Sequence, residues 1–129
     1  MNEDACYNYL RGVRWADGVT CPHCNHDMVI KNGKNENHLS CQKYKCSGCN
    51  RGFDDLTGTL FSGSKKSLKV WIACLYLMGL NVSNSQISKE LDITETTAGR
   101  MTKLLREGIA KKKLIYNLVA KLRQMRSTS

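Results

Sequence analysis

The sequence has no long hydrophobic run and no segment typical of export. Its longest apolar stretch, residues 70–80, is much shorter than the about 20 residues that a helix needs to span a membrane. Near the N-terminus, Glu3 and Asp4 stand where a signal peptide would carry basic residues ahead of an apolar segment. The 129 residues give room for one domain or two very small ones. We therefore expect neither a membrane protein nor a secreted one.

Acidic residues are scarce toward the C-terminal end, where none follows Glu107. Residues 1–53 carry a net charge of +2 and residues 54–107 one of +1, whereas the last 22 residues carry +6 of the total of +9. A basic segment on a nearly neutral body favours a polyanionic partner such as nucleic acid. Charge alone fits equally well with a solvated tail that keeps the chain soluble.

Disulfide pairing is also disfavoured, because the seven cysteines are an odd number and no export signal is present. Four of them form two Cys-x-x-Cys pairs, Cys21 with Cys24 and Cys46 with Cys49, separated by 21 residues. Zinc prefers four ligands in a tetrahedron, and two intervening residues let one tight turn bring both sulfurs to one ion. Short strands expected at 28–30 and 39–45, around a polar turn at 33–37, complete the pattern. The sequence predicts a zinc ribbon, a β-hairpin clipped by one Zn²⁺.

Other interpretations of the cysteines stay open. A redox Cys-x-x-Cys would need one pair in a thioredoxin-like setting, which is missing, whereas rubredoxin-like iron uses similar ligands. Three histidines could each replace a ligand, although a complete cysteine set makes this unnecessary: His23, His26 and His38. The other cysteines are expected in the core, Cys41 as a small hydrophobe inside a strand, and Cys6 and Cys74 in helices.

A helical pattern follows residue 61. Apolar residues spaced i, i+3, i+4 and i+7 predict a helix with one inward face, formed by Leu68, Trp71, Ile72, Leu75 and either Met78 or Gly79. Ser83 and Gln86 have the spacing of a capping box, which starts a second, short helix. Thr94 caps a third helix, whose inward residues are expected to be Ala98, Met101, Leu104 and Leu105.

The connection between the second and third helices, residues 91–94, has the length found in a helix-turn-helix, whose second helix enters the major groove of DNA. Hydroxyls and arginine early in that helix suit base edges, and later basic residues suit phosphates. The candidate DNA-binding residues are Thr96, Thr97, Arg100, Lys103, Arg106, Lys111, Lys112 and Lys113. The alternative is an ordinary three-helix bundle with a charged surface. Beyond it, an apolar stripe continues helically and would pack on the body, pair with another copy or fray: Leu114, Ile115, Leu118, Val119, Leu122 and Met125.

Together these motifs resemble the N-terminal part of zinc-ribbon insertion-sequence transposases (the IS fifteen-ninety-five type). The resemblance covers about residues 3–110 and rests on segments 14–24, 44–49, 53–61 and 87–101, with Leu68, Trp71 and, in a leading helix, Cys6 and Leu10. It implies a ribbon and a helix-turn-helix ahead of a catalytic domain of RNase-H-like fold with a DDE-type metal site.

The chain departs from that family pattern in its acidic residues. In the family, the first catalytic aspartate would follow soon after the helix-turn-helix, but here no acid follows Glu107. The remaining acids fall in ribbon or helix positions instead of an RNase-H-like sheet, among them Asp54, Asp55, Glu90 and Asp92. We therefore expect no catalytic residues, and binding of DNA without cleavage.

These observations predict a small α+β protein. It would comprise a zinc-ribbon β-hairpin with a leading helix (1–62), a helix-turn-helix unit of three helices (63–110) and a basic C-terminal helix (111–129). The expected function is zinc-dependent binding of double-stranded DNA at a transposon end or an operator. A full-length transposase, or a second copy as a homodimer, is the expected further partner, and the cytoplasm (the nucleoid, if bacterial) the expected location. Two alternatives stay open: a protein–protein or transcription-regulator module, and a transposase fragment that acts with a catalytic subunit.

Overall fold

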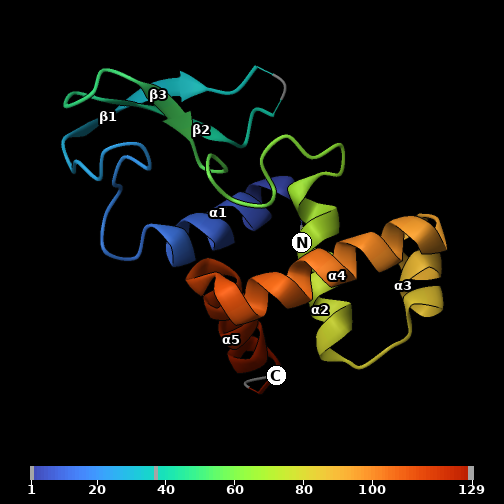
Figure 1. Ribbon diagram of the computed structural model, residues 1–129. Coiled ribbons are helices and arrows are strands. Elements are labelled where there is room, and N and C mark those ends of the chain that lie inside the picture. Colours follow the sequence, from blue (N-terminus) through green and yellow to red (C-terminus); the bar gives the residue numbers. More distant parts are fainter. Residues whose placement is uncertain (1, 37, 128–129) are drawn as a thin grey trace. The chain divides into compact units, whose positions relative to one another are not determined.

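The computed structural model describes residues 2–36 and 38–127 and divides the chain into two compact units. Residues 1–64, the ribbon unit, contain helix α1 (Glu3–Arg14) and an antiparallel sheet, and residues 65–129, the helical unit, contain helices α2 to α5 (Figure 1). This confirms the predicted α+β fold class. Across the described part of the chain, every helix falls short of the length and hydrophobicity that crossing a bilayer requires.

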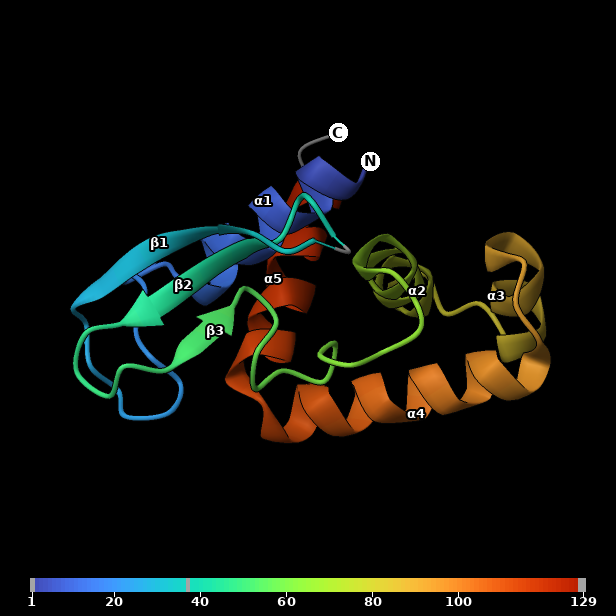
Figure 2. The same cartoon turned by 90° about the horizontal axis from the view of Figure 1, so that it is seen from above.

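The sheet of the ribbon unit has three strands in the order β1-β2-β3: β1 (Val29–Lys34), β2 (Gln42–Cys46) and β3 (Gly52–Asp54) (Figure 2). Tyr44 in the central strand pairs with Lys31 on one side and with Phe53 on the other. The predicted hairpin is therefore only two thirds of the sheet. The sequence pattern missed β3 because a three-residue strand is too short to show alternation.

Two details of the hairpin were predicted wrongly. β1 continues through Gly33, which has φ of 80° at an irregularity in the pairing between Lys31 and Lys34, so the strand ends later than expected. Asn37 of the predicted turn lies outside the described residues. Cys41 is buried, as expected for a small hydrophobe, but it lies just before β2 instead of inside a strand.

A buried carboxylate ties α1 to the sheet. The side chain of Asp55 is completely buried, and its Oδ2 accepts hydrogen bonds from Arg11 Nη1 at 2.8 Å and from the backbone N–H of Gln42 at 2.9 Å. Its Oδ1 accepts from Trp15 Nε1 at 3.2 Å and from the Tyr44 hydroxyl at 2.9 Å. Since a buried charge is tolerated only when it is paired and hydrogen-bonded, these four donors fix the helix against the strands.

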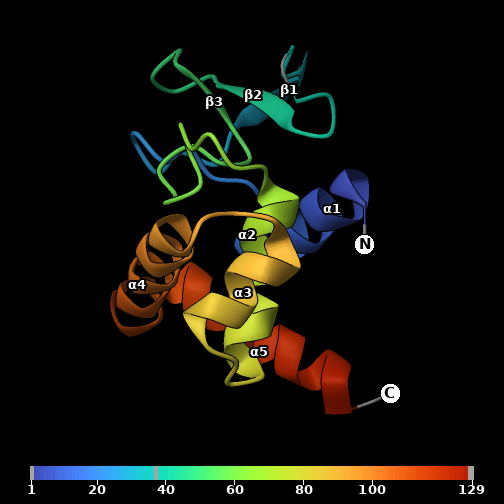
Figure 3. The same cartoon turned by 90° about the vertical axis from the view of Figure 1, so that its right-hand side faces the viewer.

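The helical unit consists of α2 (Leu68–Gly79), α3 (Asn84–Leu91), α4 (Glu95–Lys111) and α5 (Lys113–Ser127) (Figure 3). The hydroxyl oxygens of Ser83 and Thr94 cap α3 and α4 as predicted, accepting from the backbone N–H of Gln86 and of Thr97. The Gln86 side chain donates to Glu90 instead of reaching back, so only half of the capping box forms. The apolar face of α5 packs against α2 and α4, and its buried residues are Ile115, Leu118 and Leu122.

The inward face of α4 differs from the predicted one at two positions. Leu104 is 41% exposed, because the buried residues Ala98, Met101 and Leu105 define a face from which position 104 is turned by roughly a quarter turn. Thr102, which was not predicted to be inside, is completely buried, and its hydroxyl donates to Asn84 Oδ1 at 3.2 Å. In α2, by contrast, the predicted face is buried through Leu75, after which Met78 is half-buried and Gly79 exposed.

Candidate metal centre and nucleic-acid interface

The two Cys-x-x-Cys pairs fold into two similar turns, residues 21–25 and 46–50, which we call knuckles. In each, the backbone N–H of the asparagine after the pair donates to the carbonyl of the first cysteine, Asn25 to Cys21 at 2.8 Å and Asn50 to Cys46 at 2.9 Å. Both asparagines have a left-handed backbone, with φ of 63° and 61°. Asparagine tolerates this conformation better than most residues. The asparagine after each pair is thus a sequence signal that the prediction missed.

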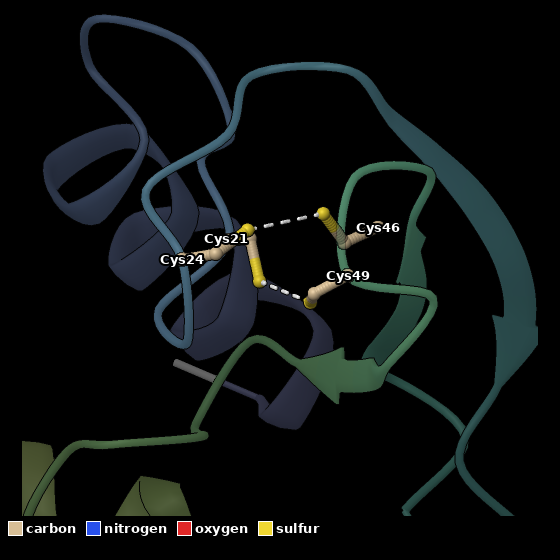
Figure 4. Close-up of side chains that lie close together, drawn as sticks. All are labelled: Cys21, Cys24, Cys46 and Cys49. Carbon is tan, nitrogen blue, oxygen red and sulfur yellow. Dashed lines mark hydrogen bonds between the residues drawn. The ribbon is translucent and has the colours of Figure 1, made fainter.

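The knuckles bring four thiols to one point. All four sulfurs, those of Cys21, Cys24, Cys46 and Cys49, lie within 4.8 Å of one another, and Figure 4 shows the side chains converging from two loops. Cys21 Sγ and Cys49 Sγ are 3.7 Å apart, and Cys24 Sγ and Cys46 Sγ are 3.5 Å apart. A tetrahedron with Zn–S bonds of about 2.3 Å has edges of about 3.8 Å, whereas a disulfide would need about 2.05 Å. The donor set and its spacing therefore fit one zinc ion.

Backbone amides point at the sulfurs and favour the thiolate form that zinc needs. His23 donates its N–H to Cys21 Sγ at 3.4 Å, and Gly48 donates to Cys46 Sγ at 3.3 Å. Hydrogen bonds from the backbone N–H of Cys49 first, and of Gly48 among others, lower the pKa of the Cys46 thiol to about 6. Cys46 is thus prepared to lose its proton when the metal binds.

The histidines lie outside this cluster. His26 instead supports the knuckles from outside: its Nδ1 accepts the backbone N–H of Met28 at 3.0 Å, and its ring packs over Gly48. A Cβ at Gly48 would lie 2.9 Å from two ring carbons of His26, so a side chain here would force the His26 ring to move. Among the described residues, the His, Cys, Asp and Glu side chains that lie close enough together to hold a metal ion are those of these four cysteines.

The remaining three cysteines, Cys6, Cys41 and Cys74, are buried away from the cluster, as expected for core residues. Burial raises the pKa of the Cys41 thiol to about 11 and that of the Cys74 thiol to about 11. These thiols stay protonated near neutral pH and are poor metal ligands.

An aromatic cluster backs the metal site. Cys21 and Cys46 are packed with Tyr44 and Phe53, whose ring centroids are 5.2 Å apart. Trp15 meets the Tyr44 ring edge to face at 6.1 Å and, through its indole N–H, also contacts Asp55. The buried carboxylate and the two inner ligands therefore share one small core, which connects the metal site to α1.

The candidate DNA-binding residues lie on or beside α4. Exposed side chains are those of Thr96, Arg100, Lys103, Arg106, Lys111, Lys112 and Lys113. Thr97 differs from the prediction, because it is half-buried and its hydroxyl oxygen accepts a hydrogen bond from the Thr94 hydroxyl at 2.9 Å. That oxygen is therefore engaged at the helix cap.

Comparison with known proteins finds a family model that matches the ribbon. Residues 1–52 match the family model of the transposase zinc-ribbon domain. Over 101 residues the chain is 36% identical to the "Uncharacterized protein in transposable element ISH50" of Halobacterium salinarum, an alignment that covers 78% of this chain and 33% of the relative. No solved structure matches the chain.

Proposed function

With a transposase-type zinc ribbon at residues 1–52 as the premise, we propose that the chain binds double-stranded DNA and that α4 reads it. The observation that carries the proposal is the connection between α3 and α4. α3 ends at Leu91, its C-cap Asp92 has a left-handed φ of 55°, and α4 begins at Glu95 behind its cap, Thr94. A three-residue turn between two helices is the spacing of helix-turn-helix proteins, whose second helix enters the major groove.

The exposed face of α4 has the chemistry that base and phosphate contacts need. Thr96, Arg100 and Lys103 are spaced i, i+4 and i+7, so they lie along one side of the helix. In the proposed complex Arg100 donates to a guanine edge, the commonest specific contact in the major groove. Lys103 and Arg106, one and two turns further on, bind phosphates that fix the helix in the groove.

The position of α4 is held from inside the helical unit. Thr102 is completely buried, and its hydroxyl lies 3.2 Å from Asn84 Oδ1 in the first turn of α3 and 3.1 Å from the Gly99 carbonyl, so a polar contact accompanies the apolar packing of the two helices. A reading helix has to be rigid, because base contacts lose their value when they are misplaced by about 1 Å.

The basic corner between α4 and α5 adds attraction for phosphate. α4 ends at Lys111, Lys112 has an extended backbone, and α5 opens with Lys113 and has no acidic residue in its first turn. Cations suit the end of α4 but oppose the positive N-terminal dipole of α5. Helix-dipole interactions therefore do not explain why all three lysines, Lys111, Lys112 and Lys113, occur together at this corner. Contact with the phosphates of a DNA backbone would explain it.

The proposed target is the end of a transposable element. The support is similarity to a protein of such an element and to the transposase zinc-ribbon family. The chain spans a third of that relative's length. We include in the same proposal that a full-length transposase, or a second copy of this chain, binds at the same DNA ends and contacts the chain there.

The test is fluorescence anisotropy of the zinc-loaded chain on duplexes that carry the terminal sequences flanking its gene, compared with scrambled duplexes. Arg100→Ala should weaken binding to the preferred duplex by roughly 1–3 kcal/mol and reduce discrimination, because it removes a base contact. Lys111→Ala should weaken binding to all duplexes and lower the salt slope by about one. Lys69→Ala, an exposed lysine on α2, is the matched control and should bind as the unaltered chain does. Equal binding by all three variants would contradict the proposal.

A further inference from the structure

One face of the ribbon sheet is exposed and basic. Antiparallel pairing places Ile30 opposite Lys45, and Lys43 opposite Asp54, so these residues share one face. Tyr44 and Cys46, which alternate with the lysines along β2, point to the other face and are buried in the core. We call the first face the outer face.

The outer face carries apolar surface beside its two lysines. Ile30 in β1 is 61% exposed, and Met28, the residue just before the strand, is 64% exposed. Gly52 on β3 pairs with Lys45 and covers nothing, which leaves the stem of that lysine open to a partner. Such a surface, apolar beside cationic, suits the sugar–phosphate backbone of DNA.

The charges of this face are available for an anion. Within the described residues neither Lys43 nor Lys45 forms an ion pair. Asp54, opposite Lys43, is engaged elsewhere, because its Oδ1 accepts from the backbone N–H groups of Leu56 at 2.8 Å and of Thr57 at 3.0 Å. Residues 28–54 hold five basic and two acidic side chains, a net charge of +3, and on the outer face Lys43 and Lys45 outnumber the one acid, Asp54.

We propose that the outer face of the ribbon sheet is a second DNA-binding surface, on which Lys43 and Lys45 contact backbone phosphates. This inference rests on the proposed function, since it extends DNA contact from α4 to the ribbon unit. The two lysines are two residues apart on one strand, so their Cα atoms are separated by about 6.8 Å and can meet separate phosphates. Contacts of this kind position a protein on DNA and do not read its sequence.

The strand alternation supplies a matched control. Lys31 pairs with Tyr44 and Lys34 pairs with Gln42, so both belong to the opposite face, and both are exposed. The double variants Lys43→Ala/Lys45→Ala and Lys31→Ala/Lys34→Ala therefore remove the same charge from the same sheet, but from different faces.

The experiment measures anisotropy of a mixed-sequence duplex of about three helical turns against salt concentration. Losing two phosphate contacts should lower the slope of log K against log salt by about 1.8, and weaken binding about 10- to 30-fold near 0.15 M salt. The opposite-face double variant should change the slope by less than about 0.5. Equal zinc content and equal tryptophan fluorescence show that each variant is folded.

Three outcomes would overturn the inference. Equal weakening by both double variants would mean diffuse attraction without a defined face. An unchanged affinity of Lys43→Ala/Lys45→Ala, together with weakened binding by Arg100→Ala and Lys111→Ala, would leave the proposed function standing and show that the outer face does not contact DNA. If the unaltered, zinc-loaded chain did not bind the duplex, the proposed function would fall along with the inference.

Discussion

Replacing Asp55 by alanine should destabilise the ribbon unit strongly, although no metal ligand is changed. The carboxylate is completely buried and accepts from Arg11, Gln42, Trp15 and Tyr44. Removing one partner of a buried ion pair costs about 3–5 kcal/mol. Arg11 is 25% exposed and keeps a hydrogen bond to the Ser40 carbonyl, which reduces the cost, whereas the orphaned Tyr44 hydroxyl and Gln42 N–H increase it. We expect a loss of about 3–4 kcal/mol in the free energy of unfolding.

The assay for Asp55→Ala is urea unfolding of the zinc-loaded chain in a Trp71→Phe background, in which Trp15 alone reports on the ribbon unit. Asp17→Ala, at an exposed acid of the same unit, is the control and should change stability by less than about 0.5 kcal/mol. A loss below about 1 kcal/mol for Asp55→Ala would refute the role given to the buried carboxylate.

Three further predictions concern the cysteines and the acids. Cys46→Ser should abolish stoichiometric zinc binding and unfold the ribbon unit, because structural zinc contributes about 10–16 kcal/mol of apparent binding energy to so small a core. Cys41→Ser should keep one zinc. Metal analysis measures the zinc content and circular dichroism the folding of each variant, and full zinc in Cys46→Ser would rule out the assignment of the ligands. Since burial raises the pKa of Cys74 to about 11 from 9.0, the folded helical unit holds that proton more tightly than the unfolded chain, so stability should fall by about 2 kcal/mol between pH 9 and pH 11. Cys74→Ala should flatten this alkaline decline when urea unfolding is followed by helical circular dichroism, and an equally steep decline in the variant would contradict it. The 129-residue chain should bind DNA without nicking it in magnesium or manganese, because the described residues gather no carboxylate cluster that could hold two metal ions; metal-dependent nicking that survives further purification would overturn this expectation.

The features predicted correctly from the sequence are those that depend on close neighbours along the chain. A Cys-x-x-Cys turn and a capping serine or threonine are completed within three or four residues, so their spacing is visible in the sequence. By contrast, the hydrogen bonds of Asp55 with Trp15 and with Arg11 join residues that are 40 and 44 positions apart in the sequence. No pattern among neighbouring residues indicates such bonds.

The two differences between the predicted and the observed inward face of α4 each have a physical cause. Leu104 and Leu105 are adjacent and therefore about 100° apart around the helix, so a single narrow core face cannot bury both, and the pattern does not say which one is inside. Thr102 was not among the residues predicted to face inward. Its burial is tolerated because the hydroxyl has two acceptors within hydrogen-bond distance, Asn84 Oδ1 on α3 and the Gly99 carbonyl.

The attachment of α1 decides how the ribbon could be moved between proteins. The metal ligands begin at Cys21, and a fragment cut there would keep every sulfur. Such a fragment would nevertheless lose Arg11 and Trp15, and with them two of the donors that neutralise a buried carboxylate, as well as the indole that covers Tyr44 and Phe53. A transplant, fusion or recombination event that preserves this ribbon must therefore join the chain before Glu3 and not at the first cysteine, so the smallest portable module is longer than its metal-binding motif.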